Sequence, residues 1–339
     1  MPWIPGSLRS KAVYLGMAAA MTVGQNAPAQ QMPTPAPNNA PQVTTVKTFA
    51  TSDFQLSRID RLSGGLRQQI PFRMVTDSQG RILVTDPFLS LVHVFDVKAG
   101  KWWQLTGDRA LRMKFPTYIA VDADDNIYVS EPLRGKVDVF LPDGHYLRTI
   151  GDEHLYVPFG LAIDKAAKKL YVADHYWHAV LVYSLDGAYL HTIGSRGTDL
   201  GQLLDPCDIA LHHGLLFVLD RGNSRFQFFD LEGNSKGVWP FGDNRRPSSF
   251  ALDRAGNLYA VDMLSLGMLV FDPAGNPVAN FDVLRQYAQP SAAPQFPSVT
   301  SVAANPDGSM LALRPALAID VFKLQPDTLA APGKSPELH

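Results

Sequence analysis

Residues Pro158–Gly194 read PFGLAIDKAAKKLYVADHYWHAVLVYSLDGAYLHTIG, and variants of this phrase occur six times along the chain. A second clear copy is Pro116–Gly151, PTYIAVDADDNIYVSEPLRGKVDVFLPDGHYLRTIG. The remaining copies start at Pro71, Pro206, Pro247 and Pro297, so successive starts lie 41–50 residues apart. Self-similarity at such a period is the signature of a repeat architecture.

Each copy carries four short strand signals, rich in Val, Ile, Leu and Tyr and bounded by turn residues. In the third copy they are Gly160–Asp164, Leu170–Ala173, Ala179–Tyr183 and Tyr189–Ile193. No copy shows the longer 3.6-residue periodicity of helical repeats. Four antiparallel strands at this period predict the blades of a propeller. The expected fold class is therefore all-β: a six-bladed β-propeller of four-stranded antiparallel blades.

The sixth copy is incomplete, which predicts how the ring closes. It offers three strands, around Val299–Ala303, Met310–Leu313 and Ala318–Phe322. The segment Val43–Ile59 before the first copy contains two strand-like runs, VTTVKTF and FQLSRI. We expect an N-terminal strand from this segment to complete the sixth blade and to leave only short edges. The sequence does not decide which run does so.

The N-terminal residues are typical of an export signal. Arg9 and Lys11 precede an apolar stretch, Ala12–Val23, and an A-x-A cleavage motif ends at Ala29. We expect a signal peptide over 1–29, a Pro/Ala-rich linker over 30–42, the propeller over 43–327 and a disordered tail over 328–339. The expected location is periplasmic or secreted.

Composition narrows the partners of this 339-residue chain. A formal net charge of −2 predicts no nucleic-acid or anionic-membrane partner. The chain has no uninterrupted run of ~20 apolar residues, so we expect no transmembrane helix. The single cysteine, Cys207, cannot form an internal disulfide, and its apolar surroundings predict a small buried residue. A closed propeller needs no partner to satisfy its edges, so we expect a monomer.

Three segments carry a recurring pattern: Pro158–Asp164 (PFGLAID), Asn257–Asp262 (NLYAVD) and Arg225–Asp230 (RFQFFD). Together they resemble the NHL repeat, and the resemblance extends over about Pro71–Leu324. It implies a six-bladed propeller. The fuller D-x-x-N-x-R pattern of that family occurs in unit four, as Asp220, Asn223 and Arg225, and the other units depart from it.

One face of the predicted propeller is expected to hold the site. The innermost strand of a blade begins on the face where the second strand ends, so residues after each opening Pro and after each second strand share that face. Loops on a rigid scaffold are the usual binding location. The predicted ligand-binding residues are Arg73, Tyr118, Arg134, His175, Tyr176, Trp177, His178, Asp208, Arg221 and Arg314.

The loop DHYWH of the third copy is the most unusual of these. Tyr176 and Trp177 offer the rigid, amphipathic area of recognition hot spots, and packing between blades is the alternative. His175 and His178 have a spacing that brings two ligands together on a helix, but this segment is a loop. We therefore predict no metal site and no cofactor.

An acidic residue ends the second strand of five copies: Asp86, Glu131, Asp174, Asp220 and Asp262. A carboxylate at this place is expected to accept backbone N–H groups and to fix the following turn, rather than to catalyse. Arg314 replaces the acid in the sixth copy.

Two classes of function remain open. Resemblance to the amidating propeller lyases would imply channel histidines that hold zinc, yet the residues after the opening prolines are Phe72, Thr117, Phe159, Cys207, Ser248 and Ser298. Calcium-dependent propeller lactonases would require Glu, Asn and Asp converging at the axis, and Asp208 is the only inner-strand carboxylate near the mouth. The favoured hypothesis is an exported, non-catalytic binding propeller for a peptide, protein, glycan or small molecule. The alternative is a propeller lyase or lactonase with a metal in the central channel.

Overall fold

The computed structural model describes residues 43–49, 73–107, 112–242, 245–264, 267–281, 300–305, 308–313 and 319–324. All of them belong to one compact unit, residues 33–339. The predicted signal peptide, the linker, the C-terminal tail, the run FQLSRI and Arg314 lie outside the described residues. Among the described residues, no helix has the length and apolar character needed to span a membrane.

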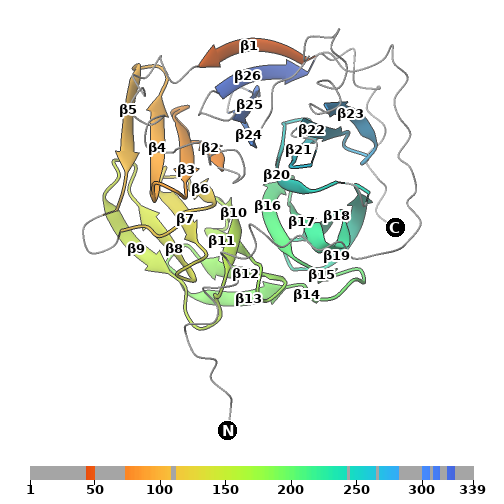
Figure 1. Ribbon diagram of the computed structural model, residues 1–339. Helices are drawn as coiled ribbons and strands as arrows, with labels where there is room; N and C mark the ends of the chain where they lie inside the picture. The colour runs from red at the N-terminus through yellow and green to blue at the C-terminus, as the bar shows by residue number, and fades with distance from the viewer. Residues whose placement is uncertain are drawn as a thin grey trace. The chain divides into compact units, whose positions relative to one another are not determined.

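The described strands form six four-stranded antiparallel sheets, which are the predicted blades (Figure 1). Blades 1 and 2 are β2 (Met74–Thr76), β3 (Ile82–Asp86), β4 (Leu91–Asp96), β5 (Lys101–Leu105), and β6 (Ile119–Val121), β7 (Ile127–Glu131), β8 (Lys136–Phe140), β9 (Tyr146–Ile150). Blades 3 and 4 are β10 (Pro158–Asp164), β11 (Lys169–Asp174), β12 (Ala179–Ser184), β13 (Tyr189–Ile193), and β16 (Pro206–His212), β17 (Leu215–Asp220), β18 (Arg225–Asp230), β19 (Ser235–Pro240).

Blade 5 contains β20 (Pro247–Leu252), β21 (Leu258–Asp262), β22 (Gly267–Phe271) and β23 (Pro277–Phe281). Blade 6 contains β24 (Ser301–Ala304), β25 (Met310–Leu313), β26 (Ile319–Leu324) and β1 (Val43–Phe49). A short parallel pair, β14 (Ser195–Arg196) and β15 (Gln202–Leu203), lies in the connection from blade 3 to blade 4. One 3-10 turn, η2 (Arg221–Asn223), follows β17.

The N-terminal strand closes the ring, as predicted. β1 pairs antiparallel with β26, from Val43 opposite Leu324 to Phe49 opposite Ile319. The run VTTVKTF thus supplies the fourth strand of blade 6. Each innermost strand contacts the next, and β24 contacts β2, so the circle of blades is complete.

The core is divided into six apolar clusters, one at each interface between neighbouring blades. In β21, Leu258 and Ala260 pack toward blade 4, whereas Tyr259 and Val261 pack toward blade 6. Alternate residues of one strand thus face opposite neighbours, which explains why the middle strands are apolar throughout rather than alternating.

Glycine is required where two innermost strands meet. A Cβ on Gly160 would lie 2.7 Å from the Cα of Asp208 in the next blade, so no side chain fits there. A register shift follows the opening proline of blades 3, 4 and 5. Such bulges redirect side chains, here at the start of the strands that line the ring.

Candidate functional site

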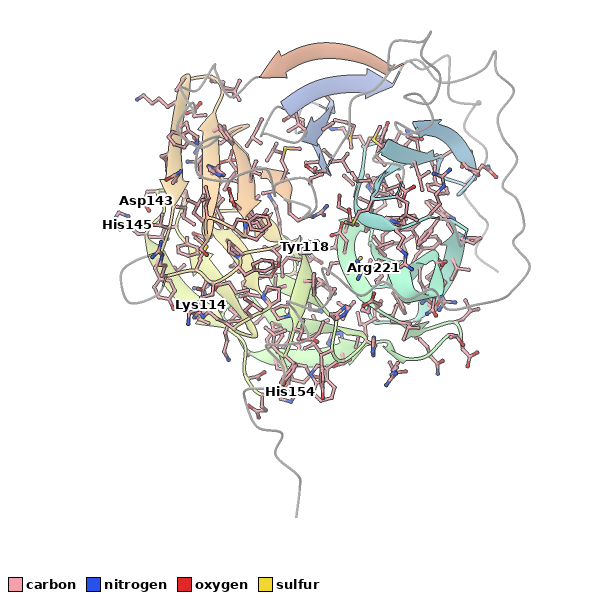
Figure 2. The ribbon with its side chains drawn as sticks, viewed as in Figure 1. Lys114, Tyr118, Asp143, His145, His154 and Arg221 are labelled. Atoms are coloured by element: carbon pink, nitrogen blue, oxygen red, sulfur yellow. The ribbon has the colours of Figure 1, made fainter. Side chains whose placement is uncertain are left out.

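A layer of six side-chain positions surrounds the axis of the ring. These positions are equivalent in the six blades, because the pairing register places each opposite the residue that precedes the acid at the end of the second strand, or opposite Leu313 in blade 6. We call them the channel layer: Arg73, Tyr118, Gly160, Asp208, Ser249 and Ser301. Figure 2 shows Tyr118 near the middle of the ring, together with Arg221.

The channel layer is tied together across the axis. Arg73 of blade 1 binds Asp208 of blade 4, with 2.6 Å between Nη2 and Oδ2. The Arg73 guanidinium also lies 4.9 Å from the ring centroid of Tyr118, and the Tyr118 hydroxyl donates to the Ser248 carbonyl of blade 5 at 3.1 Å. Blades 1 and 4, and blades 2 and 5, are opposite in a ring of six. The layer therefore braces the propeller.

The electrostatics of this layer reflect its burial. Asp208 also accepts the backbone N–H groups of Ile209 and Phe250, each at 2.9 Å. Burial raises the pKa of Asp208 to about 6, although Arg73 acts in the opposite direction. Four further polar atoms are buried without a hydrogen-bond partner among the described residues: Arg73 Nη1 and the hydroxyls of Ser248, Ser249 and Ser301. The layer is thus a polar closure of the channel.

A second polar group lies where blades 3 and 4 meet. We call it the mouth cluster: His175, His178, Asp205 and Arg221. Asp205 Oδ1 lies 2.5 Å from His175 Nδ1, and Asp205 Oδ2 accepts Arg221 Nη2 at 2.8 Å. His178 Nδ1 accepts the Asp205 N–H at 3.0 Å. Burial lowers the pKa of His175, and the neighbouring Asp205 opposes this effect.

The five acids are structural, as predicted. All are buried, and each accepts a backbone N–H. Asp174 accepts four, from Tyr156, Val157, Tyr176 and Trp177. The acids of blades 2 to 5 accept backbone N–H groups of the connection that arrives from the preceding blade. The acids of blades 1, 3 and 5 accept backbone N–H groups of the turn that follows them. They hold the loops of the mouth face in place.

Glu131 is the electrostatically unusual acid. It shares Arg134 with Asp138: Arg134 Nη1 lies 2.8 Å from Glu131 Oε1 and also bonds Asp138 Oδ2. Both carboxylates are fully buried. Burial and the neighbouring Asp138 raise the pKa of Glu131 well above its ordinary value of 4.5, although the Lys114 N–H and Arg134 oppose this. The two acids and one arginine thus favour retention of a proton.

We predict a stability loss at alkaline pH that depends on Glu131. The folded protein binds this proton more tightly than the unfolded chain does. The contribution of protonated Glu131 to the free energy of unfolding is therefore complete below the pKa of the unfolded chain, and it is lost as pH rises through the raised pKa of the folded protein. We expect the free energy of unfolding of the wild-type protein, measured in urea, to fall by on the order of 2 kcal/mol from about pH 5.5 to about pH 8.5, after allowance for screening. In Glu131→Gln this fall should be absent, because the amide does not titrate. The exposed Glu153→Gln is the control; equal losses in wild type and Glu131→Gln would refute the assignment.

Exposed apolar side chains recur on the same face. Among blades 1 to 5, four carry a large apolar side chain two residues after the acid that ends the second strand. We call these the apolar rim: Phe88 (47% exposed), Leu133 (43%), Tyr176 (52%) and Leu264 (48%). In three blades the acid accepts the N–H of this residue, so the turn geometry that the acid fixes also directs the rim side chain outward. Large apolar side chains that are about half exposed thus recur at one position of the repeat on this face.

Blade 3 widens the rim into an aromatic cluster. Tyr156 and Tyr176 have ring centroids 4.3 Å apart at 41°, and Tyr176 and Trp177 have centroids 5.0 Å apart at 81°. All three side chains are exposed. Tyr176 and Trp177 are therefore not packed between blades, which was the alternative prediction. The rings support one another and leave angled faces open to solvent.

The predicted site residues thus divide into separate groups. Arg73, Tyr118 and Asp208 are buried in the channel layer. His175, His178 and Arg221 surround Asp205, and Arg134 is bound to two acids. Tyr176 and Trp177 are exposed. Sequence reasoning missed Asp205 and Tyr156, which lie in connections outside the repeat, and it did not compare the rim positions with one another.

Two other features lie apart from the mouth cluster and the apolar rim. Asp152, Glu153 and His154 form the one group of three metal-capable side chains within the described residues, at the perimeter of the ring, where Figure 2 shows His154. His154 is stacked on Tyr189 there, with centroids 4.1 Å apart. A cavity of about 430 Å³ opens on the opposite face, beside His212, His213 and Asp253.

No protein-family model matches the chain. Similar solved structures include a streptogramin B lyase, with TM-score 0.57 and 11% identity over 75% of this chain and 93% of that one. A virginiamycin B lyase from Staphylococcus aureus has TM-score 0.55 and 11% identity over 76% and 96%. A chain of a nidogen–laminin complex has TM-score 0.52 and 18% identity over 60% and 75%. At these identities the likeness supports the β-propeller fold, and it includes enzymes as well as a protein complex.

Proposed function

We propose that this chain is an exported, NHL-type propeller that binds a partner protein through its mouth face. The observation that carries the proposal is the apolar rim, in which large apolar side chains at one repeated position are about half exposed. A soluble protein rarely repeats such exposure without a binding role. The recurring sequence pattern of the blades supports the NHL assignment, and the N-terminal signal supports export.

A protein fits this surface better than a glycan or a small molecule. Tyr176 and Trp177 stand at 81° to each other, so they form no single flat platform on which successive sugar rings could stack through their C–H faces. The rim also extends over blades 1, 2, 3 and 5, which is the scale of a protein interface. The channel offers little room for a small ligand, because Arg73 and Tyr118 bridge it to opposite blades.

The lyase or lactonase hypothesis finds less support in the described residues. Asp208, the single carboxylate of the channel layer, is already engaged by Arg73 and two backbone N–H groups. A metal held at the axis would have to displace these partners. The lyases among the similar structures share the fold at 11% identity, which does not transfer their activity. Stoichiometric zinc or calcium in the purified mature protein would contradict a binding-only role.

Photo-crosslinking in the cells that export the protein tests the proposal. Benzoyl-phenylalanine would replace Tyr176 on the mouth face or, as the control, the exposed Ala167 in the hairpin turn at the other end of blade 3. We expect a discrete adduct with a second protein from position 176 and none from position 167. An absence of adducts from position 176, or equal adducts from both positions, would reject the mouth face as the binding surface.

A further inference from the structure

The connection from blade 3 to blade 4 presents an exposed leucine on a rigid support. We call residues 195–203 the finger loop; it contains β14, β15 and, between them, Leu200, which is 66% exposed. This is the highest exposure among the large apolar side chains of the described residues. The connection runs from an outermost strand to the next innermost strand, so the finger loop belongs to the mouth face.

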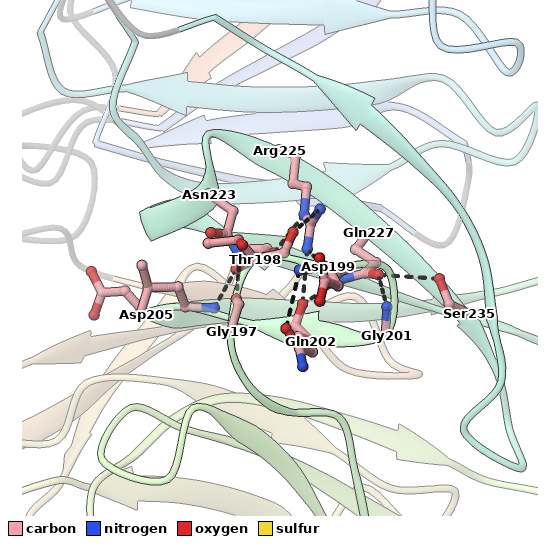
Figure 3. A network of polar contacts seen from close by, with 12 residues as sticks. Gly197, Thr198, Asp199, Gly201, Gln202, Asp205, Asn223, Arg225, Gln227 and Ser235 are labelled. Atoms are coloured by element: carbon pink, nitrogen blue, oxygen red, sulfur yellow. Dashed lines mark hydrogen bonds and ion pairs between the residues drawn. The ribbon is translucent and has the colours of Figure 1, made fainter. Parts of the chain in front are cut away.

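Side chains of blade 4 hold the finger loop in place (Figure 3). Arg225 Nη1 donates to the Thr198 carbonyl at 3.0 Å, and Nη2 donates to those of Asp199 and Gln202, both at 2.9 Å. These bonds explain why unit four alone keeps the D-x-x-N-x-R pattern: Asn223 bonds the Gly197 carbonyl at 3.0 Å, and Asp220 holds Arg225 at 2.7 Å.

Gln227 completes the support. Its side-chain oxygen accepts the Gly201 N–H at 2.7 Å, and its amide nitrogen donates to the Gln202 carbonyl at 2.9 Å. The backbone on both sides of Leu200 is thereby fixed. A group held in one conformation before binding loses little entropy when it docks, which makes Leu200 a preorganised contact.

The finger loop replaces the missing member of the apolar rim. Blade 4 has Gly222 at the rim position, and a Cβ there would lie 2.7 Å from both Cγ and the carbonyl oxygen of Leu204. The connection therefore covers the place where a rim side chain would stand, and it carries Leu200 instead. With this residue, an apolar side chain is present on the mouth face of each of blades 1 to 5.

The charges of this face favour one kind of occupant. Among the described side chains of the mouth-face connections and turns, the exposed cations are Arg112, Lys114, Arg196 and Arg246, and the exposed acids are Glu153 and Asp199. The acids at the strand ends are buried and satisfied. A second copy of this chain would bring like charges together in a symmetric contact, whereas an acidic surface would be complementary.

We propose that Leu200 anchors a different, folded protein to the mouth face, by insertion into an apolar pocket with an acidic rim. This inference rests on the proposed function and names the partner and its contact. The partner is of the class that recognises a fixed, convex apolar group, and the exposed Arg196, in β14 of the finger loop, pairs with acidic side chains at the edge of its pocket.

The test measures the yield of the crosslink from position 176 in the exporting cells, in variants of the full chain. Leu200→Asp is expected to reduce the yield about tenfold, and Arg196→Glu several-fold. The control is Leu190→Asp, at a side chain that is 44% exposed on the outermost strand of blade 3, and it should have no effect. Unfolding midpoints of all three variants should match wild type, because each changed side chain is exposed.

The outcomes separate the two proposals. A crosslink from position 176 that Leu200→Asp leaves unchanged would overturn the anchor and leave the mouth-face proposal standing. An unchanged crosslink yield in Arg196→Glu would overturn the inference that acidic side chains surround the partner's pocket. An adduct of twice the mass of this chain would identify a second copy and overturn the choice of partner. No crosslink from position 176 in otherwise wild-type protein would reject the proposed function itself.

Discussion

Asp174→Ala is expected to lower the free energy of unfolding by about 3–5 kcal/mol. The carboxylate is fully buried and accepts four backbone N–H groups, two from the connection before β10 and two from the turn after β11. Alanine leaves these donors without an acceptor, and an unsatisfied buried donor costs about 1–3 kcal/mol. The same loss should loosen Tyr156 and Tyr176 together, because Asp174 holds the backbone of both.

Urea unfolding of three proteins checks this prediction. Asp164 is the matched control, since it also accepts two N–H groups, from Ala166 and Ala167, but in an exposed turn. Asp164→Ala should cost about 1 kcal/mol or less, because water replaces the lost acceptor. Comparable losses in the two variants would mean that the acids at the strand ends have no special structural role and would reopen a functional one.

Arg73→Ala is expected to cost about 3–5 kcal/mol at neutral pH. The substitution leaves the Asp208 carboxylate buried without its cation and removes the contact of Arg73 with the Tyr118 ring. It also removes a bond between blades 1 and 4, which no contact between neighbouring blades replaces. Breaking a buried pair is costly chiefly because the remaining charge is stranded.

A second variant separates the stranded charge from a general loss of packing. Arg73→Met combined with Asp208→Asn removes both charges and keeps a side-chain oxygen for one of the two N–H groups, of Ile209 and Phe250, that the carboxylate now binds with separate oxygens. This pair should recover at least half of the loss in Arg73→Ala. The partly exposed pair Lys236–Asp230 is the control, and Lys236→Ala should cost about 0.5 kcal/mol. No recovery in the double variant would show that the ion pair is not what braces the channel layer.

The fold was predictable because every blade repeats the same requirements. In the third copy the expected strand Tyr189–Ile193 is found unchanged, and the other three differ by at most two residues at either end. The N-terminal closure followed from counting strands in the sixth copy, and VTTVKTF provides it. The role of the acids also followed from repetition, since a residue that recurs in five of the six blades serves the blade.

The site was less predictable, for physical reasons. Arg73 and Asp208 were assigned to a ligand because they are charged and lie near the mouth, but three repeats of separation place them opposite each other. An alignment of equivalent positions does not reveal a contact across the axis. Asp205 organises the mouth cluster from a connection that the repeat does not include. Leu200 likewise lies in an insertion, and only its bonded support distinguishes it from an ordinary loop residue.

Binding of the partner recovered through position 176 to a Tyr176→Ala, Trp177→Ala double variant tests the central claim most directly. The control is Leu147→Ala with Leu190→Ala, which removes exposed apolar side chains from the outermost strands of blades 2 and 3. We predict that the dissociation constant rises by about tenfold or more in the aromatic variant, and not in the control, at unchanged unfolding midpoints. Unchanged affinity in the aromatic variant, or a loss of affinity explained by its unfolding, would contradict the account.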